Sequence, residues 1–316
     1  MMDAYKDQTP SSSSTPAATR TASAPKKGMS LSSKSSKNKS LEDALVLEDK
    51  LAPIISSSKS APVAATETAP QAIQHPVMLV INEKVFARMT RDGVVESNEV
   101  KGSLTLTAAT EDAGLCSVQM KTSRNADKFT FTTHPKVNKG MYEKTGLLQL
   151  KDVNKGFPSA RPVGILKWSY SSASEDLIPL KINCWPEEES RGQMNVSIEY
   201  EMEQTDLTLH DVCIRIPLGT TDAVTIVNMD GSYKHNASQG ELEWQLPIVD
   251  GSNSSGSLEF TIAQKDTDAF FPITVDFTSQ QLFCGIEVMK VASADGSSPI
   301  QYGLSQVMSS EEYTIE

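Results

Sequence analysis

Residues 207–246, LTLHDVCIRIPLGTTDAVTIVNMDGSYKHNASQGELEWQL, contain the pattern that decides the fold. The stretch begins with alternating apolar and polar residues that end in IRIP, and this period of two predicts a β-strand. A bent connection follows, with a turn at Asp230-Gly231, because Asp-Gly pairs favour tight turns between strands. The last part predicts a second strand, on which Leu242, Trp244 and Leu246 share one face.

The same alternation continues on both sides of this stretch, from about residue 76 to the C-terminus. Half-buried antiparallel strands produce such a pattern, and no helical period of useful length interrupts it after residue 75. Further Asp-Gly turns are expected at Asp92, Asp250 and Asp295. The chain is therefore predicted to be all-β, and about 240 residues are enough for two joined β-sandwich units. The alternating residues are Leu104 and Leu106; Phe129 and Phe131; Leu166, Trp168 and Tyr170; Leu180, Ile182 and Cys184; Met194, Val196, Ile198, Tyr200 and Met202; Val212, Ile214 and Ile216; Leu242, Trp244, Leu246 and Ile248; Leu258, Phe260 and Ile262; and Ile273, Val275 and Phe277.

The N-terminal residues 1–74 differ in composition from the rest of the chain. They are rich in Ser, Lys and Pro and almost free of aromatic residues, so they bury too little apolar area to offset the entropy of ordering. We expect a disordered linker with one short helix at about residues 40–51, capped by Ser40 and ended by Pro53. Two interpretations of this helix stay open: a transient helix in a tail, or a segment that docks on a partner and orders there.

Charge and cysteine content narrow the classes of function. The chain has 29 Lys and Arg against 40 Asp and Glu, and the acidic excess lies after residue 74, which makes nucleic acid a poor partner. A membrane surface is an equally poor partner for the body as a whole, although a local basic face is compatible with this charge. The four cysteines form no CxxC pair, and we find neither a signal peptide nor an apolar run long enough to span a bilayer. These features predict a cytoplasmic protein.

Catalytic and metal-binding patterns are not found in the sequence. None of the four histidines has the spacing of a HExxH helix or of a Cys/His zinc site, and no GxSxG, P-loop or GxGxxG motif occurs. His210 and Cys213 are close in sequence, but residues three apart on a strand point to opposite faces. We therefore expect no enzyme activity, no catalytic residue, no metal and no cofactor.

Several longer runs carry a resemblance to a known family. They are TTHPKVNK (132–139), GFPSARPVGILKWSY (156–170), LIPLKINCWP (177–186), IRIPL (214–218), DGSYKH (230–235), LEWQLPIVD (242–250) and SGSLEF (255–260). Together they resemble the delta-subunit family of coatomer, the COPI vesicle coat, and within it the C-terminal mu-homology domain that also ends the adaptor medium subunits. The resemblance covers residues 75–316 and extends weakly into the lysine-rich linker.

For the fold, this resemblance implies a bent, Ig-like, antiparallel body of two β-sandwich subdomains. Subdomain A would comprise residues 75–187 and 281–316, and subdomain B would be inserted as residues 188–280. The C-terminal strands are then expected to return and pair antiparallel with the N-terminal ones. Family members begin with a longin-type domain that this chain does not contain. We accordingly expect a fragment, an incomplete gene model or a shortened form that keeps peptide docking.

For function, the resemblance implies a non-enzymatic COPI coat subunit in Golgi-to-endoplasmic-reticulum and intra-Golgi vesicle transport. Its expected ligands are short tryptophan-containing peptides on a vesicle-tethering complex and on a GTPase-activating protein for Arf. The other implied partners are an Arf-family GTPase and further coatomer subunits (beta and zeta). The implied location is the cytosolic face of the Golgi membrane and of COPI-coated vesicles, with peripheral membrane association through the coat.

The peptide site is expected at an apolar groove with a lysine rim, since acidic residues commonly flank such peptides. The candidates are Lys136, Lys139, Lys167 and Trp185. The loop at 133–139 is equally typical of an exposed, solvated connection. Trp168 and Trp244 fit the alternating faces as core residues, whereas Trp185 is followed by Pro186 and by an acidic run, and so has a weaker claim to the core.

Three other classes of function make different demands on the sequence. A clathrin-adaptor medium subunit reads tyrosine-based sorting signals through an aspartate on its first strand and a Trp-x-Arg in its last strands. Residues 84–89, KVFARM, have no such aspartate, and residues 300–304, IQYGL, have neither Trp nor Arg, so we predict that tyrosine signals do not bind. A secreted Ig-like binding domain would use the sequons at Asn195, Asn236 and Asn253. An enzyme has the least support.

Overall fold

The structure is a computed structural model that describes residues 75–122, 125–189 and 192–316. The linker predicted over residues 1–74, with its short helix at 40–51, lies outside the described residues.

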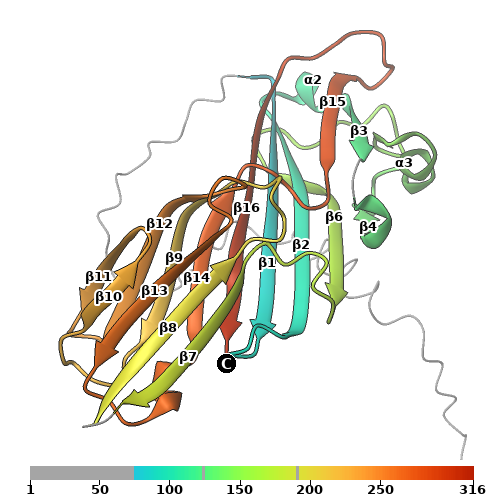
Figure 1. The fold of residues 1–316 in the computed structure, drawn as a ribbon. Coiled ribbons are helices and arrows are strands. Elements are labelled where there is room, and N and C mark those ends of the chain that lie inside the picture. Colours follow the sequence, from blue (N-terminus) through green and yellow to red (C-terminus); the bar gives the residue numbers. More distant parts are fainter. Residues whose placement is uncertain (1–74, 123–124, 190–191) are drawn as a thin grey trace, which may run out of the picture. The chain divides into compact units, whose positions relative to one another are not determined.

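The largest element of the fold is a nine-stranded sheet with the order β11-β12-β9-β14-β16-β1-β2-β6-β4 (Figure 1). It contains the first and the last strand of the described chain, so residues far apart in sequence lie side by side. Its strands are β1 (Val77–Met89), β2 (Val95–Ala108), β4 (Thr130–Thr133), β6 (Val163–Ser172), β9 (Leu209–Pro217), β11 (Ser232–Asn236), β12 (Glu241–Val249), β14 (Ile273–Ser279) and β16 (Tyr302–Ile315).

Two smaller sheets complete the strand framework. The four-stranded sheet has the order β10-β13-β8-β7, with β7 (Lys181–Glu189), β8 (Gln193–Glu201), β10 (Thr225–Met229) and β13 (Ser255–Ile262). The three-stranded sheet has the order β15-β3-β5, with β3 (Cys116–Thr122), β5 (Leu147–Leu148) and β15 (Ile286–Ser293). The helical elements in the described ranges are short: α2 (Glu111–Gly114), η1 (Ala126–Lys128), α3 (Lys139–Thr145) and η2 (Thr267–Phe270).

The hydrophobic core lies between sheets, as the period-two pattern predicts. In β8 the buried residues are Met194, Val196, Ile198 and Tyr200, and the residues between them face outward. Tyr200 packs against Trp244 of the nine-stranded sheet, with ring centroids 5.5 Å apart, so the four-stranded sheet covers one face of the larger one here. The all-β prediction is confirmed, whereas the division into two subdomains at residues 188 and 280 stays a prediction.

The direction of the C-terminal strand corrects one expectation. β16 does pair with β1, but the two strands run parallel, with Val77 opposite Tyr302 and Met89 opposite Ile315. The chain first passes through β15 in the three-stranded sheet and then enters the nine-stranded sheet between β14 and β1. It runs antiparallel to β14 on one side and parallel to β1 on the other. The expected antiparallel return is therefore wrong for β16, whereas β15 does pair antiparallel with β3.

The bent connection in residues 207–246 contains two strands that the sequence pattern did not indicate. β10 pairs with β13 in the four-stranded sheet, and β11 pairs with β12 in the nine-stranded sheet. The turn between them has Gly231 at φ 79°, a conformation that favours glycine, and the Trp244 Nε1 donates to the Asp230 carbonyl at 2.6 Å. Both strands lie at sheet edges and are mostly exposed, so they show little apolar alternation.

Ile248 was expected on the buried face of its strand, and this was wrong, since it is 47% exposed and Val249 is buried instead. The alternation shifts by one residue where β12 faces the distorted part of β9. There Asp211 has φ 53°, and Pro247 cannot donate a backbone hydrogen bond.

A buried carboxylate joins three segments of the nine-stranded sheet region. Glu83 is 1% exposed and accepts hydrogen bonds from the Trp168 Nε1 at 2.8 Å and from the backbone N–H groups of Phe283 at 2.5 Å and Cys284 at 3.2 Å. Burial raises the pKa of this carboxyl, and the three hydrogen bonds oppose that rise. Glu83 thus ties β1 and β6 to the connection that leads into β15.

Candidate peptide-docking site

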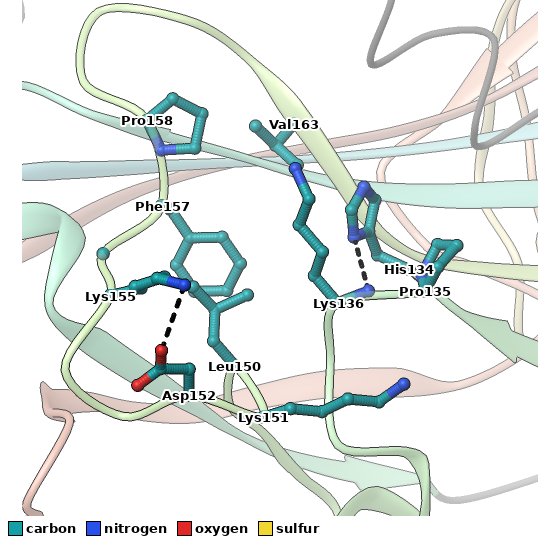
Figure 2. Close-up of a pocket in the computed structure, with 11 residues that line it drawn as sticks. His134, Pro135, Lys136, Leu150, Lys151, Asp152, Lys155, Phe157, Pro158 and Val163 are labelled. Carbon is teal, nitrogen blue, oxygen red and sulfur yellow. Dashed lines mark hydrogen bonds and ion pairs between the residues drawn. The ribbon is translucent and has the colours of Figure 1, made fainter.

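A pocket of about 550 Å³ opens beside the start of β6 (Figure 2). We call it the lysine-rimmed pocket. It is lined by His134, Pro135, Lys136, Leu150, Lys151, Asp152, Lys155, Gly156, Phe157, Pro158 and Val163. Its walls come from the connection between β4 and α3, from the segment after β5, and from β6 itself.

Short backbone ladders fix the two loops that form this pocket. The Lys151 N–H donates to the Lys136 carbonyl at 2.9 Å, and the Asn138 N–H donates to the Gln149 carbonyl at 2.8 Å. Asn138 also caps α3, because its Oδ1 accepts from the Met141 N–H at 3.2 Å. The loops are therefore held in place by paired backbone groups, which suits a preformed site.

The floor of the pocket is apolar. Leu150, Phe157 and Val163 are each less than a tenth exposed, and together they offer a surface suited to an aromatic ligand group. The Phe157 N–H donates to the Gly114 carbonyl at 2.8 Å, and a side chain at position 114 would collide with the Phe157 backbone. This close approach, which requires glycine, sets the depth of the floor.

The rim is positively charged. Lys136, Lys151 and Lys155 are among the lining residues (Figure 2), and all three are exposed. Lys155 pairs with Asp152 at 3.2 Å, and the hydrogen bond from Lys155 lowers the pKa of the Asp152 carboxyl. Residues 125–168, which we call the basic segment, have a net positive charge. Their basic residues are Lys128, Lys136, Lys139, Lys144, Lys151, Lys155, Arg161 and Lys167, and their acidic residues are Asp127, Glu143 and Asp152.

His134 forms the back of the pocket with its imidazole 5% exposed. Its Nδ1 accepts from the Lys136 N–H at 3.1 Å, so the neutral ring carries its proton on Nε2 in this arrangement. The ring holds the Lys136 backbone in position at the rim.

The structure separates the residues that were predicted to form the site. Lys136 lines the lysine-rimmed pocket, Lys139 lines a second hollow between α3 and β4, and Lys167 lines a third on the outer face of β1, β2 and β6. Trp185 lies on β7 and lines none of the three. The sequence analysis did not pick out Lys151, Lys155 or the floor residues, although the run KDVNKG at 151–156 offered a signal, with two lysines on either side of a turn.

Other kinds of site receive no support from the described part of the chain. No group of three or more His, Cys, Asp or Glu residues in it is placed to hold a metal ion. Burial raises the pKa of all four cysteine thiols, to about 12 for Cys116 and for Cys184, which is the reverse of what a reactive nucleophile needs. No helix in the described ranges is both long and apolar enough to cross a membrane.

The described strands form the fold of a mu-homology domain, as the comparison with solved structures shows. The solved yeast delta-COP-I mu-homology domain has this fold: it superposes with a TM-score of 0.68 at 27% identity, covering 78% of this chain and 99% of that one. The same yeast domain complexed with a Dsl1 WxWxV peptide gives a TM-score of 0.67 at 26% identity, with the same coverage of both chains.

The chain belongs to the adaptor complexes medium subunit family, whose model matches residues 63–316. It is 36% identical over 259 residues to a probable coatomer subunit delta of Caenorhabditis elegans, which covers 82% of this chain and 49% of that protein. The chain therefore spans about half the length of this relative. The predicted resemblance to coatomer delta subunits and the predicted mu-homology fold are confirmed, and the family is one of coat and adaptor subunits rather than of enzymes.

Proposed function

We propose that this chain acts as the peptide-docking module of a COPI coat subunit of delta type, and that the lysine-rimmed pocket takes a short tryptophan-containing peptide with acidic flanks. The observation that carries the proposal is the pairing of an apolar floor, Leu150, Phe157 and Val163, with an exposed lysine rim. An indole fills the floor, and carboxylates beside it meet the lysines. The likeness to a yeast domain solved with a WxWxV peptide supports this ligand class.

The broader role follows from the same likeness. A docking module of this family would act in Golgi-to-endoplasmic-reticulum and intra-Golgi transport, on the cytosolic face of Golgi membranes and COPI vesicles. Its partners would be beta and zeta coatomer subunits, a vesicle-tethering complex, and an Arf-family GTPase with its GTPase-activating protein.

The direct test is a titration of the full chain with a fluorescent WxWxV peptide that has acidic flanks. The same peptide with both tryptophans changed to alanine, and a tyrosine-signal peptide, serve as ligand controls. We expect binding of the tryptophan peptide only. Binding of the tyrosine-signal peptide would contradict the prediction made from residues 84–89 and 300–304.

A scan of lysines decides which hollow is used. Lys151→Glu combined with Lys155→Glu should weaken binding about tenfold or more, because two charges that attract the acidic flanks of the peptide then repel them. A tenfold loss of affinity corresponds to about 1.4 kcal/mol. Lys139→Glu tests the second hollow and Lys167→Glu the third, and we expect less than about a twofold change from either. Lys234→Glu combined with Lys290→Glu is the matched control, since both lysines are exposed and lie outside the three hollows. A loss confined to Lys139→Glu or to Lys167→Glu would move the site away from the lysine-rimmed pocket.

A further inference from the structure

Trp185 is exposed on a sheet face that no other layer covers. It is 40% exposed, whereas Trp168 and Trp244 are 1% and 0% exposed. Among the strands of the described residues, β7 pairs only with β8, so it is an edge strand. Ile182 and Cys184 occupy its buried positions, so the indole faces outward. Its cross-strand neighbour is Ser197, which is too small to cover it. A single exposed apolar side chain is common on protein surfaces, so the case for a docking group rests on the charged residues around this indole as well.

Carboxylates surround this tryptophan on the same outer face. Glu187 and Glu189 follow it at the alternate positions of β7 that also point outward. Glu199 lies on β8 opposite Asn183, and is thus the diagonal neighbour of Trp185. All three glutamates are exposed. The face therefore presents an indole in an extended strand with acidic groups around it.

This is the ligand chemistry that we assign to the lysine-rimmed pocket. We propose that Trp185, with Glu187 and Glu189, of one copy of this chain docks at the lysine-rimmed pocket of a second copy. The inference rests on the proposed function, because it uses the same pocket, and it adds a means of regulation: a chain engaged in this way has its pocket occupied until a tryptophan peptide displaces the neighbour.

A second copy is a better occupant than the same copy. β7 is tied to the turn between β1 and β2, since the Cys184 N–H donates to the Arg91 carbonyl at 3.0 Å. The pocket loops are tied instead to α2 and β6, through Phe157 and His134. Both surfaces are thus fixed on one hydrogen-bonded strand framework and cannot swing toward each other without breaking it. Two copies can meet freely.

The charge distribution favours this contact. The pocket lies in the basic segment of an otherwise acidic body, so the two docking surfaces attract each other over a distance. Because the two surfaces differ, the contact is heterologous and joins copies head to tail rather than as a closed pair. An indole with a few exposed ion pairs gives a weak, salt-sensitive association.

The surface around Trp185, Glu187 and Glu189 has a competing ligand within the same chain. The run KKGMSLSSKSSKNK at residues 26–39 is basic, so it is attracted to these glutamates by its charge. This run has the same sign of charge as the lysine-rimmed pocket. If it were the ligand of the glutamates, substitutions at the pocket would leave self-association unchanged. The test below separates the two.

Self-association is measured by sedimentation velocity of the full chain, over a wide range of concentrations at low salt. We expect the average mass to rise above the 34.3 kDa of the monomer, and to fall back when salt or the WxWxV peptide is added. Trp185→Ala should remain monomeric. Lys151→Glu with Lys155→Glu should remain monomeric, and so should Glu187→Lys with Glu189→Lys, because each then presents like charges at the contact.

Mixing the two charge-reversed variants is the decisive step. Each pocket then meets a complementary face on the other variant, so the mixture should associate although neither variant does so alone. The control variant, Lys234→Glu with Lys290→Glu, should associate like the unchanged chain. Failure of the mixture to associate, or association that survives both pocket changes, overturns the inference. If the unchanged chain binds the WxWxV peptide when dilute yet stays monomeric when concentrated, the inference fails and the proposed function stands. If the unchanged chain neither binds the peptide nor associates, both the inference and the proposed function fail.

Discussion

Trp168 and Trp185 lie on consecutive strands, β6 and β7, and have opposite surroundings. Trp168 is buried, lies against Gly102 of the neighbouring strand and donates to the carboxylate of Glu83 at 2.8 Å. Trp185 is exposed on the last strand of its sheet, opposite Ser197 and near glutamates that face solvent. Both residues follow the alternation of a strand, yet only one has a second layer over it.

The difference shows what a covered and an uncovered sheet face can each contribute. On a buried sheet face, an indole and a carboxylate are removed from water and must stay hydrogen-bonded to each other. They therefore stabilise the fold and cannot bind another molecule. Without cover, the same groups keep their hydration and their freedom to meet a partner. Four substitutions test this contrast, and they are ordered by the size of the effect that we expect.

The largest effect should come from Trp168→Ala. The change removes a fully buried ring and leaves Glu83 without its side-chain donor, so we expect unfolding free energy to fall by about 3–5 kcal/mol. Urea denaturation followed by circular dichroism measures it. A loss below about 1 kcal/mol would show that the buried cluster does not stabilise the sheet.

Glu83→Gln keeps the size of the side chain and removes its charge. One acceptor oxygen becomes an N–H₂ group that faces a backbone or indole N–H, and we expect a loss of about 1–3 kcal/mol at neutral pH. The pKa of Glu83 is raised in the folded chain, so its contribution is full below the unfolded pKa of about 4.3 and declines as pH rises through the folded pKa. The stability gap between the unchanged chain and Glu83→Gln should therefore narrow as pH rises from about 4. A gap that widens instead would mean that the hydrogen bonds outweigh the burial.

Gly102→Ala probes the packing beneath Trp168 without touching any polar group. A Cβ at this position would overlap the indole, which is enclosed and has little room to move, so we expect a loss of about 1–3 kcal/mol. Gly140→Ala is the matched control, because Gly140 also has no positive φ and a Cβ there would meet only the Asn138 Oδ1, at 3.8 Å. Equal losses at both positions would show that the overlap with the indole is not the cause.

The buried residues of the sheets could be predicted from the sequence, whereas the exposed surface features could be predicted only in outline. Residues such as Met194, Val196 and Ile198 alternate because each side of their strand has one environment, so sequence spacing alone identified the core. Ile248 broke this rule because Asp211, on the paired strand, shifts the alternation, and a cross-strand effect is not visible in one strand's pattern. β16 was assigned the wrong direction because strand direction depends on the path through β15.

The docking pocket was harder to predict for the same kind of reason. Its floor combines Leu150, Phe157 and Val163, which are brought together by backbone ladders between loops rather than by any sequence period. A lysine rim was expected, but spacing along the chain could not show that Lys136 lines the same pocket as Lys151 and Lys155 while Lys139 and Lys167 line other hollows. The exposure of Trp185 was easier to predict, because Pro186 and the acidic run after it indicate a position outside the core.

Trp185→Ala should have the smallest effect on stability, and this makes it the sharpest test of the contrast. Its indole is already partly in water on an edge strand, so the loss should stay below about 1 kcal/mol, within the range that side-chain preference on a strand spans. The urea midpoint would then differ from that of Trp168→Ala by a wide margin, although both changes remove the same atoms. If the two variants lose similar stability, Trp185 is part of the core and is not available as a docking group. If Trp185→Ala is stable and self-association is lost, the covered tryptophan supports the fold and the uncovered one makes the contact between copies.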